Sequence, residues 1–167
     1  MGFQFNPDEV LEMAEQIERN GARFYIEATK AVKDRAVGKL LLELADWERK
    51  HERVFAAMRA NLTEAERQAM VFDPDHETYL YLRAMADGHI FDVRMNSANL
   101  LTGEETAEEI LLIAIGKEKD SIIFYLGLKE LMSDRTGRHK VDEVIKEEMN
   151  HIAYLNKELA AWRQRTI

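Results

Sequence analysis

The sequence predicts an all-α fold, specifically a four-helix bundle, on three observations. Apolar residues make up 46% of the 167 residues and charged residues 32%, with only eight glycines and two prolines, a composition rich in helix formers. Hydrophobic side chains recur at steps of three and four residues over four long segments, as in amphipathic helices. The first and last parts of the chain also match each other without a gap. The length suits one domain over residues 1–167.

The first two helices each have a recognisable start. Asn6 and Glu9 can form a capping box, and Pro7 suits the first turn. Asp34 can cap the helix that follows after a short turn. Because no breaker interrupts the apolar pattern up to about Asn61, these two helices should form a hairpin.

The connecting region has weaker signals. Thr63 and Glu66 offer another capping box, and Pro74 breaks the helical pattern. A short helix should run from about Asp75 to near Gly88. The chain therefore travels to the third long helix through a partly helical crossover.

The last two helices should form a second hairpin. Thr102, with Glu105 three residues later, is expected to open the third long helix. Asp134 or Thr136 should open the fourth. The four long helices are thus expected at about residues 7–32, 36–61, 103–132 and 135 or 137 to 163.

An internal duplication relates the two hairpins. Residues of the first meet identical residues of the second at an offset of one hundred positions, polar ones included. Such pairs are Glu9 and Glu109, Glu18 and Glu118, Tyr25 and Tyr125, Asp34 and Asp134, Glu48 and Glu148, and His51 and His151. The chain is therefore interpreted as hairpin one at about residues 7–61, a crossover at about 62–103, and hairpin two at about 104–165.

The expected buried stripe of each long helix contains a glutamate. Two helices contribute a lone glutamate, and each of the other two contributes a Glu-x-x-His pair, whose spacing places both side chains on one helix face. Four buried carboxylates repel one another and need compensating positive charge. No lysine or arginine occupies these stripes, so two divalent metal ions are the simplest solution. The predicted ligands are Glu18, Glu48, His51, Glu118, Glu148 and His151.

Several further aromatic and histidine side chains are candidates for the same site. Tyr25 and Tyr125 lie two turns after the lone glutamates and can either donate a hydrogen bond to a ligand carboxylate or serve as core aromatics. Trp47, Trp162 and the methionines are interpreted as packing residues. The remaining histidines lack an apolar stripe and are expected in loops or at the surface; they are His76, His89 and His139.

With these residues identified, the chain resembles the rubrerythrin-related branch of the ferritin-like superfamily. The segments that carry the resemblance are IERNGARFY, ERKH, YLRAMADGHIF, KEKDSIIFY and EEMNH. The resemblance implies a di-iron site on the same six residues, although manganese and zinc also accept such ligands. Two features depart from full rubrerythrins: the chain has no cysteine for a rubredoxin-type iron centre, and Ser121 occupies the position of an additional glutamate.

Three functions are compatible with this pattern. We expect a non-haem di-iron oxidoreductase that reduces peroxide or dioxygen with electrons from an external donor, such as a rubredoxin-type protein. Iron oxidation and sequestration, as in ferritins, is the alternative, and a helical module merely stabilised by metal is a third. Metal ligands apart, no catalytic side chain is expected.

Composition narrows the partners and the location. The net charge of −8 argues against a nucleic-acid surface. No segment is long and apolar enough for a membrane span, and the first residues do not have the pattern of a signal peptide. We therefore expect a cytoplasmic protein. Because the helices have faces beyond the core stripe, we also expect a homodimer.

Overall fold

The computed structural model describes residues 6–68, 77–86 and 101–166. Every element within these residues is a helix, which confirms the predicted fold class. The helices are α1 (Pro7–Ala31), α2 (Arg35–Ala60), α3 (Glu64–Gln68), α4 (Glu77–Ala86), α5 (Ala107–Leu131) and α6 (Arg138–Arg165).

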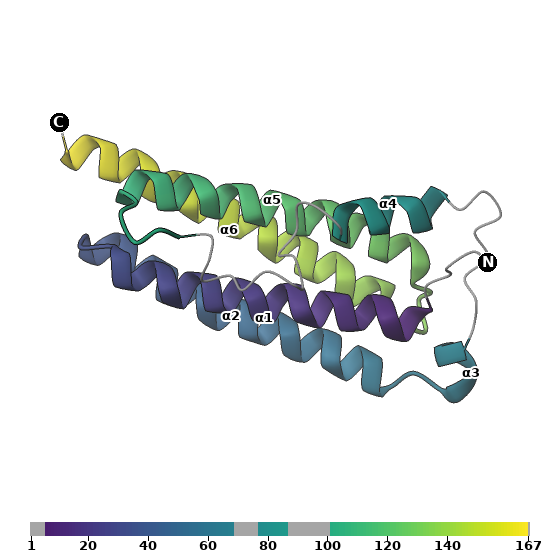
Figure 1. Cartoon of the computed structure of the whole chain (residues 1–167). Helices are drawn as coiled ribbons and strands as arrows, with labels where there is room; N and C mark the ends of the chain where they lie inside the picture. Colours follow the sequence, from purple (N-terminus) through teal and green to yellow (C-terminus); the bar gives the residue numbers. More distant parts are fainter. Residues whose placement is uncertain (1–5, 69–76, 87–100, 167) are drawn as a thin grey trace.

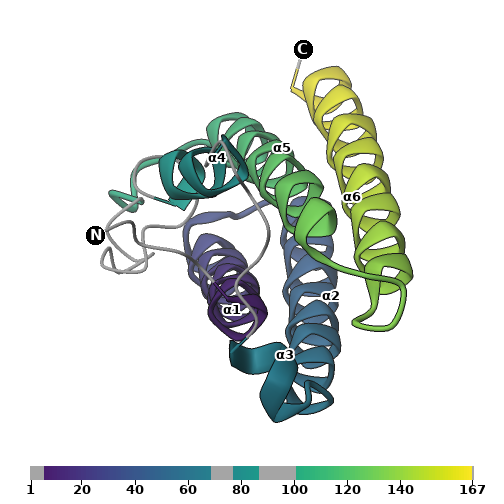
Figure 2. The same ribbon diagram turned by 90° about the vertical axis from the view of Figure 1, so that its right-hand side faces the viewer.

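Four long helices form the bundle, as Figure 1 shows. The first hairpin packs α1 along α2, and the second packs α5 along α6. The hairpins meet through contacts of α1 with α5 and of α2 with α6. The end-on view in Figure 2 shows these four helices around a common centre, with α4 outside them against α5.

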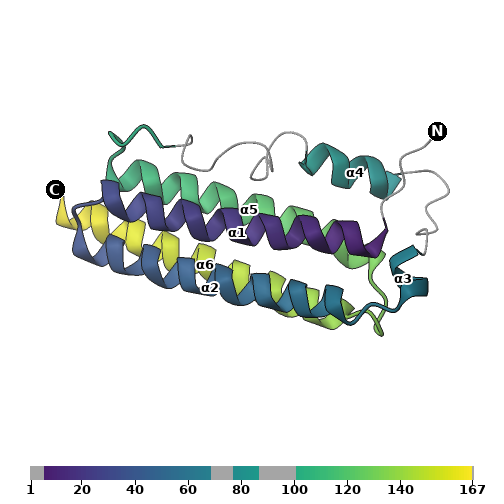
Figure 3. The same cartoon turned by 60° about the horizontal axis from the view of Figure 1, so that its bottom comes forward.

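The direction of the helices explains the long crossover. The colours in Figure 1 show that α2 and α5 run the same way along the bundle, so the chain must return over its full length between them. Figure 3 shows α4 lying beside α5 on this route. Gly127 of α5 permits the close approach, because a Cβ there would lie 2.6 Å from the Tyr81 ring. The Tyr81 hydroxyl donates a 2.6 Å hydrogen bond to the carbonyl of Ile123.

The predicted caps of the first hairpin and of the crossover are present. The Glu9 amide donates to Asn6 Oδ1 at 2.9 Å, and the Asn6 amide donates to Glu9 Oε2 at 3.1 Å. Asp34 accepts hydrogen bonds from the first amides of α2. Thr63 and Glu66 form the expected reciprocal contacts at the start of α3. Helix α4 lies inside the range expected for the short helix, whose remaining residues are outside the described ones.

Both helix starts predicted for the second hairpin are wrong. Helix α5 begins four residues later than expected, at Ala107, with a capping box formed by Thr106 and Glu109. Thr102 and Glu105 do hydrogen-bond to each other, but Gly103 between them has a φ of +87°, which turns the chain away from a helical path.

The start of α6 differs for a related reason. Neither Asp134 nor Thr136 caps this helix, and its N-cap is Gly137, with a φ of +108° and no capping side chain. Ser133 and Thr136 instead bond each other, since the Ser133 amide donates to Thr136 Oγ1 at 2.8 Å and the Thr136 amide donates to Ser133 Oγ at 3.2 Å. The local turn therefore occupies the groups that a cap would have used.

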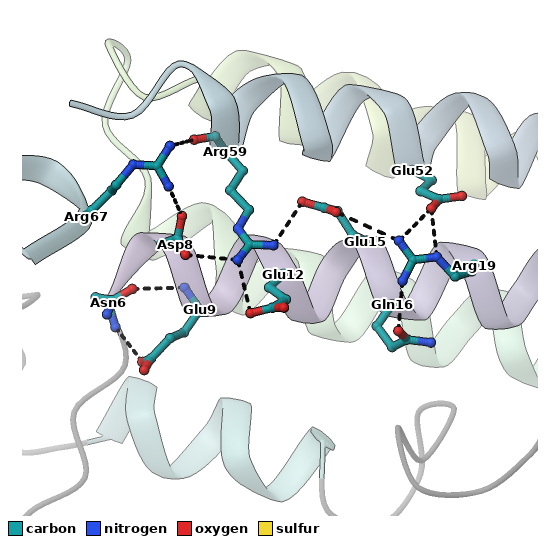
Figure 4. A network of polar contacts seen from close by, with 10 residues as sticks. All are labelled: Asn6, Asp8, Glu9, Glu12, Glu15, Gln16, Arg19, Glu52, Arg59 and Arg67. Carbon is teal, nitrogen blue, oxygen red and sulfur yellow. Dashed lines mark hydrogen bonds and ion pairs between the residues drawn. The ribbon is translucent and has the colours of Figure 1, made fainter. Parts of the chain in front are cut away.

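A polar network outside the core joins the first hairpin to α3 (Figure 4). Asp8 of α1 accepts hydrogen bonds from Arg59 of α2 and from Arg67 of α3. The hydrogen bond from Arg59, and then the charges of both arginines, hold the pKa of Asp8 below its usual value despite partial desolvation. Arg19 and Glu52 make a similar link between α1 and α2 at 2.8 Å. These contacts, outside the core, hold α1 and α2 in their relative position in addition to the packing of the buried centre.

The interior between the four long helices is an apolar core, and eight polar side chains are buried among the residues that the structure describes. Phe24, Phe55 and Phe124 are fully buried within it, and each such side chain contributes about 1.5–3 kcal/mol by leaving water. Six of the eight polar side chains are the predicted metal ligands, and the other two are Asn20 and Ser121. The core therefore surrounds the candidate site with hydrocarbon.

Candidate metal centre

The structure brings all six predicted ligand side chains together in the middle of the bundle. Each is at most 3% exposed. Helices α1 and α5 contribute one glutamate each, and α2 and α6 contribute one Glu-x-x-His pair each. They are Glu18, Glu48, His51, Glu118, Glu148 and His151.

These side chains form two overlapping groups of four. One group is Glu18, Glu48, His51 and Glu148, and the other replaces Glu18 and His51 with Glu118 and His151. In each group the candidate ligand atoms lie within 4.8 Å of one another. Glu48 and Glu148 belong to both groups, so two metal positions would share them. Each lone glutamate belongs to one group and would serve one position as its terminal carboxylate.

The donor atoms fit a pair of cations. Among the described residues, four buried atoms of this cluster make no hydrogen bond of good geometry, although two of them, His51 Nδ1 and Glu148 Oε1, lie 2.9 Å apart: Glu18 Oε2, Glu48 Oε1, His51 Nδ1 and Glu148 Oε1. Buried polar atoms without partners are costly, and cations placed between them would satisfy all four. Carboxylate oxygens and imidazole nitrogens suit iron, manganese and zinc. Two divalent ions would offset the four carboxylate charges.

Electrostatic crowding among the buried carboxylates shifts their pKa values in different directions. Burial, followed by the charges of neighbouring glutamates, raises the pKa of Glu48. Burial and the charge of Glu148 likewise raise the pKa of Glu118. Burial acts in the same direction on Glu148, but hydrogen bonds from Glu118, His151 and His51 outweigh it and lower its pKa.

Both histidines point Nδ1 into the cluster. His51 Nδ1 lies 2.9 Å from Glu148 Oε1 and 3.6 Å from Glu18 Oε2. His151 Nδ1 lies 2.9 Å from Glu148 Oε2 and 3.4 Å from Glu118 Oε2. Burial alone lowers the pKa of an imidazole, but the adjacent carboxylates reverse this and raise the pKa of His51 to about 12 and that of His151 to about 9. Metal binding must displace these protons.

Of the two interpretations left open for the tyrosines, the structure shows both: each is a core aromatic that also donates a hydrogen bond to a candidate ligand, across the bundle. Tyr25 of α1 donates to Glu118 of α5, and Tyr125 of α5 donates to Glu18 of α1. Both rings are also fully buried in the core. Burial, followed by the carboxylate charges, raises the pKa of both phenols, so they stay protonated donors. Each half of the duplication thus orients the lone glutamate of the other half.

The sequence interpretation missed two side chains next to the candidate ligands. Glu147 Oε2 lies 2.8 Å from His51 Nε2, and the Trp47 ring stacks on the His151 ring at 4.9 Å between centroids. The prediction of Trp47 as a packing residue is thus incomplete, because its ring contacts a candidate ligand. The available signal was positional, since both residues lie one turn before a predicted histidine ligand.

The remaining residues predicted to pack or to lie at the surface are outside the ligand groups. Of the methionines, Met58 and Met132 pack in the core as predicted, but the prediction is wrong for Met149, which is 58% exposed. Trp162 packs against the core as expected. His139 is exposed. His76 and His89 lie outside the described residues.

This fold and site define the class of the protein: a ferritin-like bundle with a buried carboxylate and histidine cluster for two metal ions. A family model named Rubrerythrin matches residues 9–159. The chain belongs to the rubrerythrin family.

One similar solved structure extends this finding to the fold. It is a Thermotoga maritima protein described as a ferritin-like diiron-carboxylate protein, with a TM-score of 0.73 and 26% sequence identity. The match covers 96% of this chain and 98% of that one. A comparison with curated proteins gives no significant match.

Among the described residues, no helix is long and apolar enough to cross a membrane.

Proposed function

We propose that this protein is a non-haem di-iron oxidoreductase that reduces peroxide or dioxygen with electrons from an external donor. The observation that carries the proposal is the pair of four-donor groups that share Glu48 and Glu148 in an apolar core. Glu18 with His51, and Glu118 with His151, would complete the two metal positions.

Iron is the proposed metal because the donor set suits it and because the reaction needs a metal that changes oxidation state. Manganese and zinc accept the same donors, and zinc would leave the protein without redox chemistry. A bound iron pair would supply electrons to an oxygen substrate and Lewis acidity to polarise it.

The chain's own residues would hold this site in place and keep it dry. Tyr25 and Tyr125 each fix one terminal carboxylate by a hydrogen bond, which limits its rotation. Phe55 and Phe124 pack against the Tyr125 ring at centroid distances of 5.0 and 5.8 Å. Their hydrocarbon surfaces reduce the access of water to the carboxylates, which strengthens electrostatic interactions at the site.

The electron donor would be a separate protein, for example of the rubredoxin type. The chain has no cysteine and so cannot form a cysteine-ligated iron centre of its own. We further propose that the protein acts as a homodimer in the cytoplasm. Sedimentation or light scattering of the iron-loaded protein measures the first of these properties.

The test is multiple-turnover consumption of peroxide by the iron-loaded protein with a chemical reductant. Activity should depend on iron and collapse in Glu48→Ala and Glu148→Ala, because each substitution removes a donor from both metal positions. Glu143→Ala is the matched control, since Glu143 is an exposed glutamate on α6. Unchanged rates in the two ligand variants would refute the proposal.

The peroxide assay, together with measurements of assembly size and melting temperature, separates the two alternative functions. Iron oxidation without continued peroxide consumption, in a large hollow assembly, would indicate iron sequestration. A metal-dependent rise in melting temperature without any redox turnover would indicate a structural role. Either result would replace the proposed oxidoreductase function.

A further inference from the structure

Positions 47 and 147 are equivalent in the internal duplication, yet they carry different residues. Trp47 and Glu147 each lie four residues before the histidine of their own helix. In the structure each contacts the histidine of the other half. This is a chemical difference between two halves of the candidate metal centre that supply the same types of ligand.

Glu147 holds the outer edge of the His51 ring. Its Oε2 lies 2.8 Å from His51 Nε2, while His51 Nδ1 faces Glu148 and Glu18 inside the cluster. With Nδ1 as the metal-binding atom, Nε2 carries the proton, and this N–H donates a hydrogen bond to Glu147 Oε2. The Glu147 side chain is 57% exposed, whereas the His51 side chain is 2% exposed. The contact therefore joins a buried candidate ligand to a carboxylate at the surface.

The corresponding neighbour of His151 is an aromatic ring. Trp47 stacks on His151 with an interplanar angle of 11°, and Tyr154 also contacts the Trp47 ring, at 5.5 Å between centroids and a tilt of 31°. Trp47, His151 and Tyr154, with Glu147 and Asn150, line a surface depression of about 190 Å³. An indole ring adds no negative charge to the histidine that it covers.

We propose that Glu147 is a positioning residue that makes the two metal positions unequal, with tighter binding at the position served by His51. The inference rests on the proposed di-metal site, but it does not depend on the reaction. A carboxylate that accepts the outer N–H of a histidine ligand fixes the ring's tautomer and orientation and makes the inner nitrogen a stronger donor. Its negative charge also favours a cation at that position.

The geometry assigns this effect to one position only. Glu48 and Glu148 are shared, and the tyrosine contacts to Glu18 and Glu118 are matched in the two halves. The Glu147 contact to His51 and the Trp47 contact to His151 therefore distinguish the two metal positions. Removing the carboxylate should weaken one metal and leave the other nearly unchanged.

The test is calorimetric titration of the metal-free, full-length protein with Zn²⁺. The wild type should show two classes of site. In Glu147→Leu the tighter class should weaken about 10- to 100-fold, the usual effect of removing such an outer partner. Glu147→Gln keeps a neutral acceptor and should fall between these two proteins. Glu143→Leu and Glu143→Gln, which change an exposed glutamate on the same helix, should match the wild type.

Nuclear magnetic resonance of the zinc-loaded protein gives an independent readout that a general loss of stability would not produce. One histidine Nε2 proton should be strongly deshielded and protected from exchange in the wild type. It should shift and exchange faster in Glu147→Gln, while the signals of the other ligand histidine stay in place. Trp47→Phe should move the signals of that second histidine instead.

Equal weakening of both sites, or no weakening of either, would overturn the inference. Because Zn²⁺ is not redox active, this outcome is separate from the fate of the proposed function. Unequal zinc sites in a protein that does not consume peroxide would support the inference and refute the oxidoreductase. Peroxide turnover in a protein with two equal sites would do the reverse.

Discussion

Gly21 provides a direct test of where Glu48 lies. It is buried in α1, three residues after Glu18, and a Cβ at this position would lie 2.7 Å from Glu48 Oε2. Ordinary contact begins at 3.4 Å, so in Gly21→Ala the carboxylate oxygen must move by roughly 0.7 Å. Metal ligands tolerate deviations of only about 0.2 Å from their usual distances. The substitution should therefore disturb a donor that both proposed metal positions share.

The expected effects on metal binding and on stability have opposite signs. We expect zinc affinity to fall at least 10- to 100-fold, or about 1.4–2.7 kcal/mol, by analogy with the loss of a ligand's outer partner. In the metal-free protein the displaced atom is the end of a flexible side chain, which can move at low cost. Replacing a helical glycine by alanine then contributes about 0.5–1 kcal/mol. For a chain of this size that corresponds to a rise of about 1–4 °C in melting temperature.

Calorimetry with Zn²⁺ and thermal melting of the metal-free protein measure the two effects. Ser121→Ala is the matched control for binding, because Ser121 is the duplicate of Gly21 and already has a Cβ. Gly38→Ala is the control for stability, because a Cβ there meets nothing within 4 Å. If Gly21→Ala binds zinc as tightly as the wild type, the assignment of Glu48 as a shared ligand is refuted.

Three further predictions concern the same centre. Tyr125→Phe leaves Glu18 without its phenolic donor and should destabilise the metal-free protein by about 1–3 kcal/mol in denaturant unfolding. Tyr25→Phe should destabilise it by a similar amount. A loss below roughly 0.5 kcal/mol, the scatter of surface substitutions, would contradict the reasoning. In the folded protein the pKa values of His51 and His151 are raised to about 12 and about 9, and these shifts contribute stability that is complete below the unfolded pKa of 6.5 and is lost as pH rises. The melting temperature of the metal-free protein should therefore fall between pH 6.5 and 9. A melting temperature that does not change over this range would count against protonated histidines. Zinc at one hundred times its dissociation constant should add about 2.7 kcal/mol per independent site, seen as a rise of about 5–11 °C in melting temperature that a chelator reverses; no rise would exclude specific binding to the folded state.

The helix boundaries show how far local patterns can be trusted in this chain. The capping boxes at Asn6 and Thr63 are confirmed, because each depends on a few adjacent residues. The predicted start of α5 was wrong because two possible capping boxes follow each other directly, at Thr102–Glu105 and at Thr106–Glu109, and the positive φ of Gly103 leaves the second to cap the helix. The start of α6 was wrong because Thr136 bonds Ser133 instead of an amide of the helix. Competition between equally local alternatives is decided by the rest of the fold.

The sequence by itself determined the helical fold class and the six buried donor side chains. Helical periodicity and the internal duplication carry this information, because the face on which a side chain lies depends only on its spacing along one helix. The tertiary structure decided which carboxylates both groups share, that each tyrosine bonds the opposite glutamate, and that Glu147 and Trp47 contact opposite histidines. Each of these relations crosses between the two hairpins. Their relative rotation and spacing are set by the packing of the whole core, which no single helix records.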